Sequence, residues 1–408
     1  MLKNIRSSLL LPVVLALGLA LDNVDSQVHA APLSSAPLLG VGGRVTDLVK
    51  YTLDLTTILT AADPFKALGQ TLSNSSNPDP IPAVSGTYSL VNTSATSPLP
   101  DALKQTFIQK TLQYSSAVYC PSVLSGSWTC GPYCDANPQF QLQTVGGDGG
   151  NVQFFFVGWN PPTKEIVVTH QGANTNNIST YLYLVDFPPA VPDQSILTTL
   201  SRVSYPRSQS NVPVGLLGDV VAPPLSGPGE VNYTLVAGGA QTAWLKQYPT
   251  ILTAVQQLYA AHPDTARVFV NGHSLGAVAA LYSGLALRSV VPTSIPIEVS
   301  RTAPIREGNP VFAELVDALT ASPAQNFTNH HTIHYQDSVP HLFPLVSGYQ
   351  HTGNEIWITN SDKTYNAPAV TCPGRENVNC ALSQGLTENL LDHPGPYWGV
   401  LIGNNCTR

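Results

Sequence analysis

Charged side chains are scarce in this chain, since lysine, arginine, aspartate and glutamate make up only 11% of its 408 residues. Soluble proteins carry about 25%, so hydroxyl and amide groups have to keep this surface in water. The net charge of -7 comes without a run of basic residues, which argues against a nucleic-acid partner. Glycans would add polarity, and Asn-X-Ser/Thr sequons begin at Asn74, Asn92, Asn177, Asn232, Asn326 and Asn405.

Long apolar runs are also missing after the N-terminus. Lys3 and Arg6 precede an apolar run from Leu9 to Leu21, and Val28-His29-Ala30 has the small residues of a cleavage site. The run is too short to span a bilayer, and no later stretch approaches the roughly 18 to 20 apolar residues of a membrane helix. We predict that residues 1–30 are a signal peptide, that the protein is secreted and extracellular, and that it has no permanent membrane insertion.

Cysteine is limited to six residues, and export to an oxidising compartment allows them to pair. Six thiols permit 15 pairings, and short spacing favours the local ones. The expected disulfide bonds are Cys130 with Cys134, Cys372 with Cys380, and Cys120 with Cys406. A zinc site is the alternative, but the four-residue spacing lacks a matching second Cys or His pair.

Residues 31–105 form an N-terminal extension in our interpretation. It contains a possible helix from Val45 to Leu72 and two Ser/Asn/Pro-rich tracts, Ser73 to Pro82 and Asn92 to Pro100. Such tracts are typical of linkers or exposed arms. A pro-segment, a cap on the main domain and a disordered tail all remain open for the extension.

Residues 106–408 show alternating helical and strand-like patterns. The expected elements are a helix from Phe107 to Tyr119, a hairpin of Val152 to Val157 and Glu165 to Thr169, a helix from Trp244 to Ala260, a strand from Arg267 to Val270 and a helix from Leu275 to Leu287. This order predicts an α/β domain with a mostly parallel central sheet flanked by helices.

A candidate nucleophile lies between the last of these strands and the helix that follows it, in Gly272-His273-Ser274-Leu275-Gly276. Chance alone would give roughly 0.2 matches to Gly-X-Ser-X-Gly in such a chain. The surroundings strengthen the motif, because a strand-to-helix turn exposes the Ser hydroxyl and requires Gly where a Cβ would clash. We therefore predict that Ser274 is the nucleophile of an α/β-hydrolase fold.

A serine nucleophile needs a histidine base and a carboxylate that orients it. In the α/β-hydrolase order both follow the serine. Asp337 follows a strand-like run and precedes Val339-Pro340, and His393 lies in a turn. The other groups after Ser274 are Asp317, Asp362, Asp392, His330, His331, His334, His341 and His351. The residues alone leave this choice open.

Several separated motifs follow one another over roughly residues 107–408. They are Tyr119-Cys120, Trp128 to Gly131 with Cys134, Val268 to Gly276, Ala303 to Asn309, Asp337 to Leu342, Gly348 to His351, Glu355 to Trp357, and Asp392-His393. This ordered series resembles the fungal-type class 3 lipases, a family of extracellular α/β-hydrolases. The resemblance implies a triad of Ser274, Asp337 and His393. It also implies the same three disulfide pairings that the spacing favours.

The chain departs from the family at the oxyanion segment, where His170-Gln171-Gly172-Ala173 stands in place of Phe-Arg-Gly and a Ser or Thr. Backbone N–H groups of Ala173 and Leu275 remain able to form an oxyanion hole, but Ala173 brings no hydroxyl. Losing one donor typically costs about 10²- to 10³-fold in kcat. The stretch from Tyr181 to Val185 fits either an apolar lid face or a core strand, and Pro188 to Val231 is longer than the family's connection.

We expect a triacylglycerol lipase that acts on lipid esters at a lipid-water interface without a metal or organic cofactor. A feruloyl or other cell-wall ester hydrolase is the alternative enzyme, since the resemblance covers both. A catalytically silent lipid-binding protein is the alternative of another class, favoured only by the altered oxyanion segment. The oligomeric state stays open.

Overall fold

The computed structural model describes residues 92–150, 152–173, 189–203, 234–343, 345, 349–385, 389–403 and 406. The predicted signal peptide, the possible helix from Val45 to Leu72 and the stretch from Tyr181 to Val185 lie outside these residues. The interpretations of those three segments therefore stay predictions.

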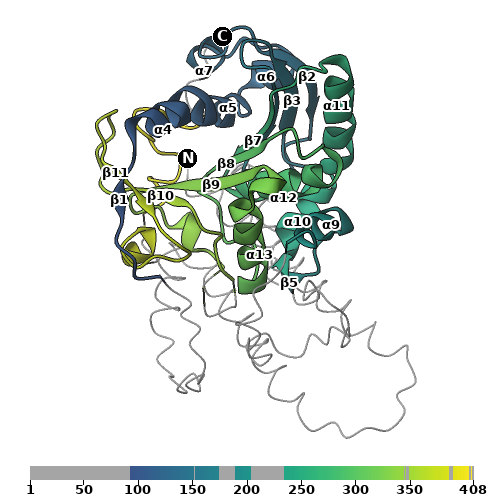
Figure 1. The fold of residues 1–408 in the computed structure, drawn as a ribbon. Helices are drawn as coiled ribbons and strands as arrows, with labels where there is room; N and C mark the ends of the chain where they lie inside the picture. Colours follow the sequence, from purple (N-terminus) through teal and green to yellow (C-terminus); the bar gives the residue numbers. More distant parts are fainter. Residues whose placement is uncertain are drawn as a thin grey trace, which may run out of the picture. The chain divides into compact units, whose positions relative to one another are not determined.

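A nine-stranded sheet forms the centre of the described fold (Figure 1), in the order β1-β11-β10-β9-β8-β7-β4-β3-β2. The strands are β1 (Ser97–Pro98), β2 (Gln141–Gly146), β3 (Phe155–Asn160), β4 (Glu165–His170), β7 (Arg267–His273), β8 (Ile297–Thr302), β9 (Phe327–His334), β10 (Glu355–Ile358) and β11 (Ala369–Cys372). Strands β4, β7, β8, β9 and β10 run parallel, and the outer strands pair antiparallel. A separate two-stranded pairing joins β5 (Pro189–Ala190) to β6 (Val236–Ala237).

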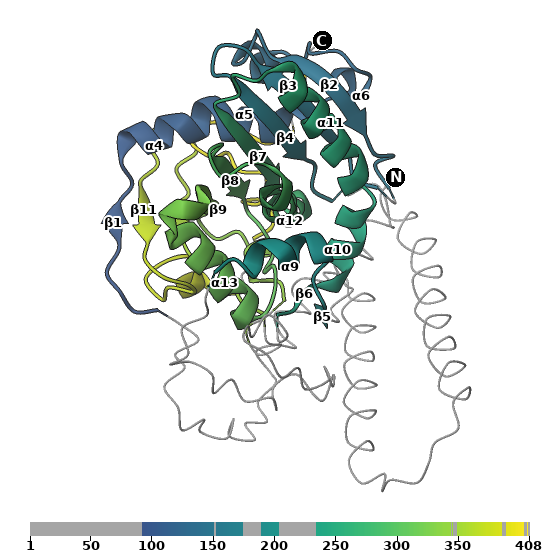
Figure 2. The same ribbon diagram turned by 45° about the vertical axis from the view of Figure 1, so that its right-hand side comes forward.

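Helices cover both faces of this sheet (Figure 2). One layer contains α9 (Gln194–Leu200), α10 (Gly238–Leu245), α11 (Tyr248–Ala261), α12 (Leu275–Val290) and α13 (Pro310–Ala321). The other layer contains α4 (Asp101–Thr106), the π-helix η2 (Phe107–Thr111), α5 (Leu112–Ala117), α6 (Pro121–Leu124) and α7 (Pro132–Asp135). Short 3-10 turns η6 (Pro323–Gln325), η7 (Val339–His341) and η9 (Ala381–Gln384) complete the elements.

Successive side chains of a strand point to opposite faces of the sheet, so apolar strand residues pack under the helices on both faces. In β7, Val268 and Val270 join the large cluster under α12, whereas Phe269 joins the aromatic cluster around Tyr114 of α5. Since β7 is buried from Val268 onward, its carboxyl end is fixed from both sides. The residues that follow it are held by the same packing.

The structure moves several predicted boundaries. The helix expected from Phe107 begins at Asp101 and continues through η2 and α5 to Ala117. The helix expected over Trp244 to Ala260 is two helices, because α10 ends at Leu245 and Pro249 lies in the first turn of α11. The expected hairpin is present as β3 and β4, which pair antiparallel from Phe155 onward.

The tract from Asn92 to Pro100 is not a linker but forms an edge of the sheet, which corrects one of the two interpretations, and most of its residues are exposed, as the other expects. Ser97 and Pro98 pair with β11, and Asn92 bridges Asn377. The fold thus includes residues before 106, where we expected the domain to begin. An edge strand that is exposed on both sides shows no apolar alternation, so its composition looks like that of a loop.

Three disulfide bonds join Cys120 to Cys406, Cys130 to Cys134 and Cys372 to Cys380. These are the pairings that spacing and resemblance favoured over a zinc site. Among the described residues, none of the helices combines the length and the apolar composition needed to cross a membrane.

Candidate active site

Ser274 lies at the sharp turn between β7 and α12 with φ 61° and ψ -129°. This left-handed conformation is unfavourable for a residue with a side chain, and the flanking glycines make it sterically feasible. A Cβ at Gly272 would lie 2.3 Å from the carbonyl oxygen of Gly276, and a Cβ at Gly276 would lie 2.5 Å from the carbonyl oxygens of His170 and Gln171. The backbone therefore requires glycine at both flanks of the serine.

Asp337 and His393 meet although 56 residues separate them, since the His393 Nδ1 lies 2.8 Å from the Asp337 Oδ2. The other carboxylate oxygen, Oδ1, accepts the N–H of Val339 at 2.9 Å. With its side chain fully buried, Asp337 is an acceptor at both oxygens, so the ring Nδ1 carries a proton. The His393 Nε2 is then left to accept a proton, as a general base requires.

His273, the residue before Ser274, ties the nucleophile turn to the His393 loop. The His273 Nε2 lies 3.0 Å from the main-chain oxygen of His393, and the two rings lie 4.5 Å apart between centroids. Tyr397 also donates its hydroxyl to this carbonyl at 3.1 Å. Ser274 and His393 are thereby brought to the same edge of the sheet.

Tyr119 connects His273 to the oxyanion segment. Its hydroxyl lies 2.9 Å from the His273 Nδ1 and accepts the N–H of Gly172 at 2.9 Å. Burial lowers the pKa of His273 well below its ordinary value, and the nearby His393 lowers it further. The ring is therefore neutral, and the contacts fix one tautomer, in which Nε2–H donates to the His393 carbonyl and Nδ1 accepts from Tyr119.

The predicted oxyanion donors lie on the two segments that enclose Ser274. Leu275 is the first residue of α12, where backbone N–H groups have no partner within the helix. Ala173 follows Gly172, and a Cβ at Gly172 would lie 2.8 Å from the Cβ of Ser274. The oxyanion segment thus packs directly on the nucleophile turn, and the helix N-terminus favours developing negative charge there.

His170 stands where the family pattern has Phe, and its side chain takes part in a buried hydrogen-bond network. Its Nδ1 lies 2.6 Å from the Gln247 Oε1, and its Nε2 lies 3.0 Å from the Ser283 hydroxyl, which accepts the indole N–H of Trp244 at 2.9 Å. Burial lowers the pKa of His170 to about 4, so the ring stays neutral in this network. This network anchors the end of β4, from which the oxyanion segment continues.

The sequence did not predict a role in the site for three residues that support it: Tyr119, His273 and Asp392. The positions of Tyr119, directly before Cys120, and of His273, inside the nucleophile motif, could have indicated a role in the site. Asp392 accepts the N–H of Gln336 at 3.2 Å and an amide N–H of Asn389 at 2.6 Å. It joins the loop of His393 to the residue before Asp337, and its adjacency to His393 was the available signal.

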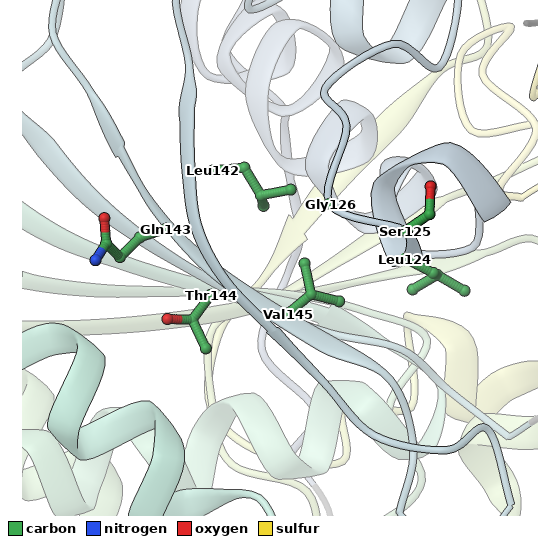
Figure 3. Close-up of a pocket in the computed structure, with 7 residues that line it drawn as sticks. All are labelled: Leu124, Ser125, Gly126, Leu142, Gln143, Thr144 and Val145. Atoms are coloured by element: carbon green, nitrogen blue, oxygen red, sulfur yellow. The ribbon is translucent and has the colours of Figure 1, made fainter.

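Two other features of the described residues do not belong to this site. A hollow of about 260 Å³ lies between α6 and the edge strand β2 (Figure 3), and its lining contains none of the predicted site residues. Glu355, Cys372 and Cys380 form a buried group with metal-ligating atom types. The two sulfurs are joined in a disulfide bond, so they are not thiolate ligands.

The family model described as Lipase (class 3) matches residues 217–347. A secreted mono- and diacylglycerol lipase of Malassezia globosa is 27% identical over 262 residues, which cover 64% of this chain and 73% of that protein. A lipase of Rhizopus niveus is 36% identical over 169 residues, 40% of this chain and 41% of its own length. A solved triacylglycerol lipase, described as having a serine protease triad as its catalytic centre, is 22% identical with a TM-score of 0.57, over 76% of this chain and 99% of that one. The fold of this chain is thus that of a known α/β-hydrolase.

Proposed function

We propose that this chain is a member of the class 3 lipase family, whose model matches residues 217–347, and that it is a secreted carboxylic ester hydrolase that acts on acylglycerols, triacylglycerols among them. The observation that carries this proposal is the Asp337–His393 hydrogen bond beside the left-handed turn of Ser274. The names of the relatives, which include secreted lipases of mono- and diacylglycerols, support the class of substrate.

In this mechanism His393 removes the proton from the Ser274 hydroxyl as the oxygen attacks the ester carbonyl. The Nδ1–H of His393 remains bonded to Asp337, whose negative charge stabilises the imidazolium. The N–H groups of Ala173 and Leu275 hold the oxyanion, and His393 then protonates the leaving glyceride oxygen. Water repeats the sequence on the acyl-enzyme and releases the fatty acid.

The absence of a hydroxyl at Ala173 restricts the oxyanion hole to main-chain donors. Removal of a side-chain donor typically costs about 10²- to 10³-fold in kcat where nothing replaces it. The Tyr119 hydroxyl, which fixes the N–H of the adjacent Gly172, supports the position of this segment. We propose that such main-chain preorganisation serves in place of the hydroxyl.

Localisation and domain boundaries are part of the same proposal. Residues 1–30 act as a signal peptide, a segment beyond them forms an extension, and the enzyme acts outside the cell on a lipid-water interface. Reading the N-terminus of the secreted protein tests the cleavage site, and a start at Met1 would contradict it.

The substrate proposal is tested with the secreted protein on emulsified triolein and diolein, on soluble p-nitrophenyl butyrate and on methyl ferulate. We expect fatty acid release from the emulsions and no activity in Ser274→Ala. A fluorophosphonate probe is expected to label the wild type and not this variant. Hydrolysis of methyl ferulate with inert emulsions would favour the cell-wall esterase, and absence of labelling would favour a catalytically silent protein.

A further inference from the structure

Arg306 and Glu376 form a buried ion pair close to the proposed catalytic acid. The Arg306 Nε donates to the Glu376 Oε1 at 2.8 Å and its Nη2 donates to Oε2 at 2.9 Å. Only 2% of Arg306 and 4% of Glu376 are exposed. Burial alone would raise the pKa of Glu376, but the charge and hydrogen bonds of Arg306 lower it to about 2. The pair is therefore ionised and holds a planar two-bond geometry.

The remaining donors of this pair reach the acid loop, which we define as residues 337–343. The Arg306 Nη1 donates to the carbonyl oxygens of His341 at 2.9 Å and Phe343 at 3.3 Å. His351 contributes a third contact, because its Nε2 lies 2.8 Å from the carbonyl oxygen of Pro340. The N–H of His351 is itself bonded to the Glu376 Oε1 at 2.8 Å. One carboxylate thus orients both groups that hold the acid loop.

Glu376 is in turn held by the disulfide loop, which we define as residues 372–380. Glu376 has φ 46°, a conformation that surrounding contacts have to maintain. The Cys372–Cys380 bond closes the loop. The N–H of Asn92 donates to the Glu376 carbonyl at 3.1 Å, and the N–H of Val378 donates to the Asn92 carbonyl at 2.9 Å.

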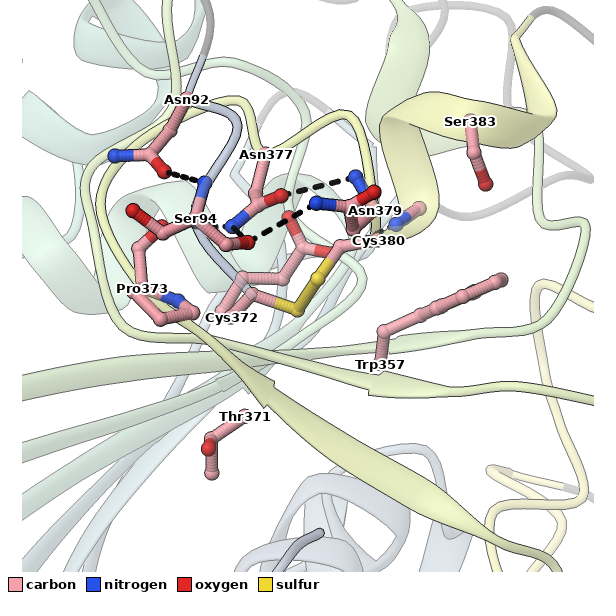
Figure 4. The surroundings of a disulfide bond; sticks show 12 residues. Asn92, Ser94, Trp357, Thr371, Cys372, Pro373, Asn377, Asn379, Cys380 and Ser383 are labelled. Carbon is pink, nitrogen blue, oxygen red and sulfur yellow. Dashed lines mark hydrogen bonds between the residues drawn. A yellow bond between two sulfur atoms is a disulfide. The ribbon is translucent and has the colours of Figure 1, made fainter. Parts of the chain in front are cut away.

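Side-chain amides attach the same loop to the N-terminal edge of the fold (Figure 4). Asn377 donates to the carbonyl of Ser94 at 3.1 Å, and Asn379 donates to the same carbonyl at 3.1 Å. The position of the Glu376 carboxylate therefore depends on a covalent closure and on main-chain bonds that lie outside the acid loop.

We infer that Arg306 and Glu376 are positioning residues for Asp337, and that the disulfide loop fixes the acid of the catalytic site through them. The inference rests on the proposed function. Movement of the acid loop shifts the Asp337 carboxylate relative to the His393 Nδ1, and a displacement of about 1 Å at such a contact can lower the rate about 10²-fold. Both side chains are buried, so we expect their loss to affect kcat more than KM.

The test uses two ways of loosening the acid loop. Arg306→Lys keeps a cation beside Glu376 but cannot bind both carboxylate oxygens and the carbonyls of His341 and Phe343 at once. Cys372→Ser with Cys380→Ser opens the disulfide loop and leaves both residues of the ion pair unsubstituted. We expect each protein to lose about 10- to 100-fold in kcat on p-nitrophenyl butyrate with little change in KM. Active-site titration with a fluorophosphonate gives the concentration of folded, competent enzyme, so that kcat is calculated per working site.

Glu165→Gln is the matched control. Glu165 is a buried carboxylate paired with Lys110 at 2.7 Å at the amino end of β4, the end opposite to the site. The control is expected to lower Tm and to leave kcat within about twofold of wild type. If Arg306→Lys lowers Tm by a similar amount and also leaves kcat unchanged, the pair is only structural and the inference fails.

A triple variant, with Arg306→Lys and both cysteine substitutions, tests whether the disulfide loop acts on Asp337 through Arg306. If the disulfide loop acts through Arg306, the triple variant loses about as much kcat as the more affected parent, since coupled residues are not additive. Losses that multiply would show independent effects and overturn the inference. Failure of the proposed function itself is distinct, because it would appear in the wild type, as acylglycerol emulsions that are not hydrolysed or as absence of fluorophosphonate labelling.

Discussion

Tyr119→Phe removes a hydroxyl that connects the oxyanion segment with the nucleophile turn. The substitution leaves the ring and its packing in place but deletes the partner of the Gly172 N–H and of the His273 Nδ1, each at 2.9 Å. Gly172 and His273 are both buried. We expect the variant to fold with a less stable structure and a weakened active site.

The size of the effect follows from the two groups that lose a partner. A buried polar group without its hydrogen bond costs about 1–3 kcal/mol, so the free energy of unfolding should fall by about 2–6 kcal/mol. The Gly172 N–H adjoins the proposed donor at Ala173, so its release also disturbs the oxyanion hole. Loss of one donor sets an upper limit of about 10²- to 10³-fold in kcat, and we expect a decrease of at least about tenfold.

Tyr397→Phe is the matched control for Tyr119→Phe. Its hydroxyl donates to the His393 carbonyl at 3.1 Å, and that carbonyl keeps the His273 Nε2–H at 3.0 Å. Only about 0.5–1.5 kcal/mol should be lost. Unfolding in denaturant gives the stabilities, and kcat on a soluble ester after active-site titration gives the catalytic effect. If Tyr119→Phe behaves like this control in both assays, the proposed role of the hydroxyl is wrong.

Three further predictions follow from the glycines, the buried carboxylates and the disulfides. Gly276→Ala should lower kcat by about 10²-fold, because the added Cβ would lie 2.5 Å from main-chain oxygens. In the control Gly284→Ala the added Cβ would lie 2.3 Å from the Val299 side chain, so Tm should fall while kcat per titrated site stays unchanged. Burial raises the pKa of Glu355 to about 7, so its contribution to stability is present below about pH 4.3 and is lost as the pH rises through 7. Glu355→Gln, which keeps an acceptor for the Ala381 N–H, should therefore match the wild type in unfolding free energy at about pH 4 and exceed it by up to about 3 kcal/mol at about pH 9. Equal stability at the higher pH would contradict this. Replacing Cys120 and Cys406 by Ser should cost about 6 kcal/mol, against about 2 kcal/mol for Cys130 and Cys134, because their sequence separations are 286 and 4. Thermal melts that rank the two variants in the opposite order would refute the chain-entropy argument.

The parts of the site that the sequence predicts are those that local geometry dictates. Ser274 was identified because a strand-to-helix turn requires Gly272 and Gly276, and the structure shows why their Cβ atoms are excluded. Asp337 and His393 needed the order of the fold and the family resemblance, since a loop carboxylate or imidazole has no local signature. Their hydrogen bond joins residues 56 apart.

The supporting contacts could not be predicted because they depend on tertiary closeness. The Tyr119 hydroxyl meets His273 across 154 residues, and Asn377 meets Ser94 across 283. No periodicity encodes such contacts. The break between α10 and α11 is different, since Pro249 in the first turn of α11 is a helix-start signal that the apolar pattern obscured.

The buried cations have a consequence for how the protein meets its substrate. The chain has only 18 lysines and arginines, and Lys104, Arg288, Arg301 and Arg306 are all enclosed in the fold. A basic side chain near an anionic membrane contributes about 1 kcal/mol of attraction, and enclosed cations contribute none of it. On the proposed function, adsorption to a neutral fat droplet should therefore depend on apolar contact, and added salt or anionic lipid should change it little.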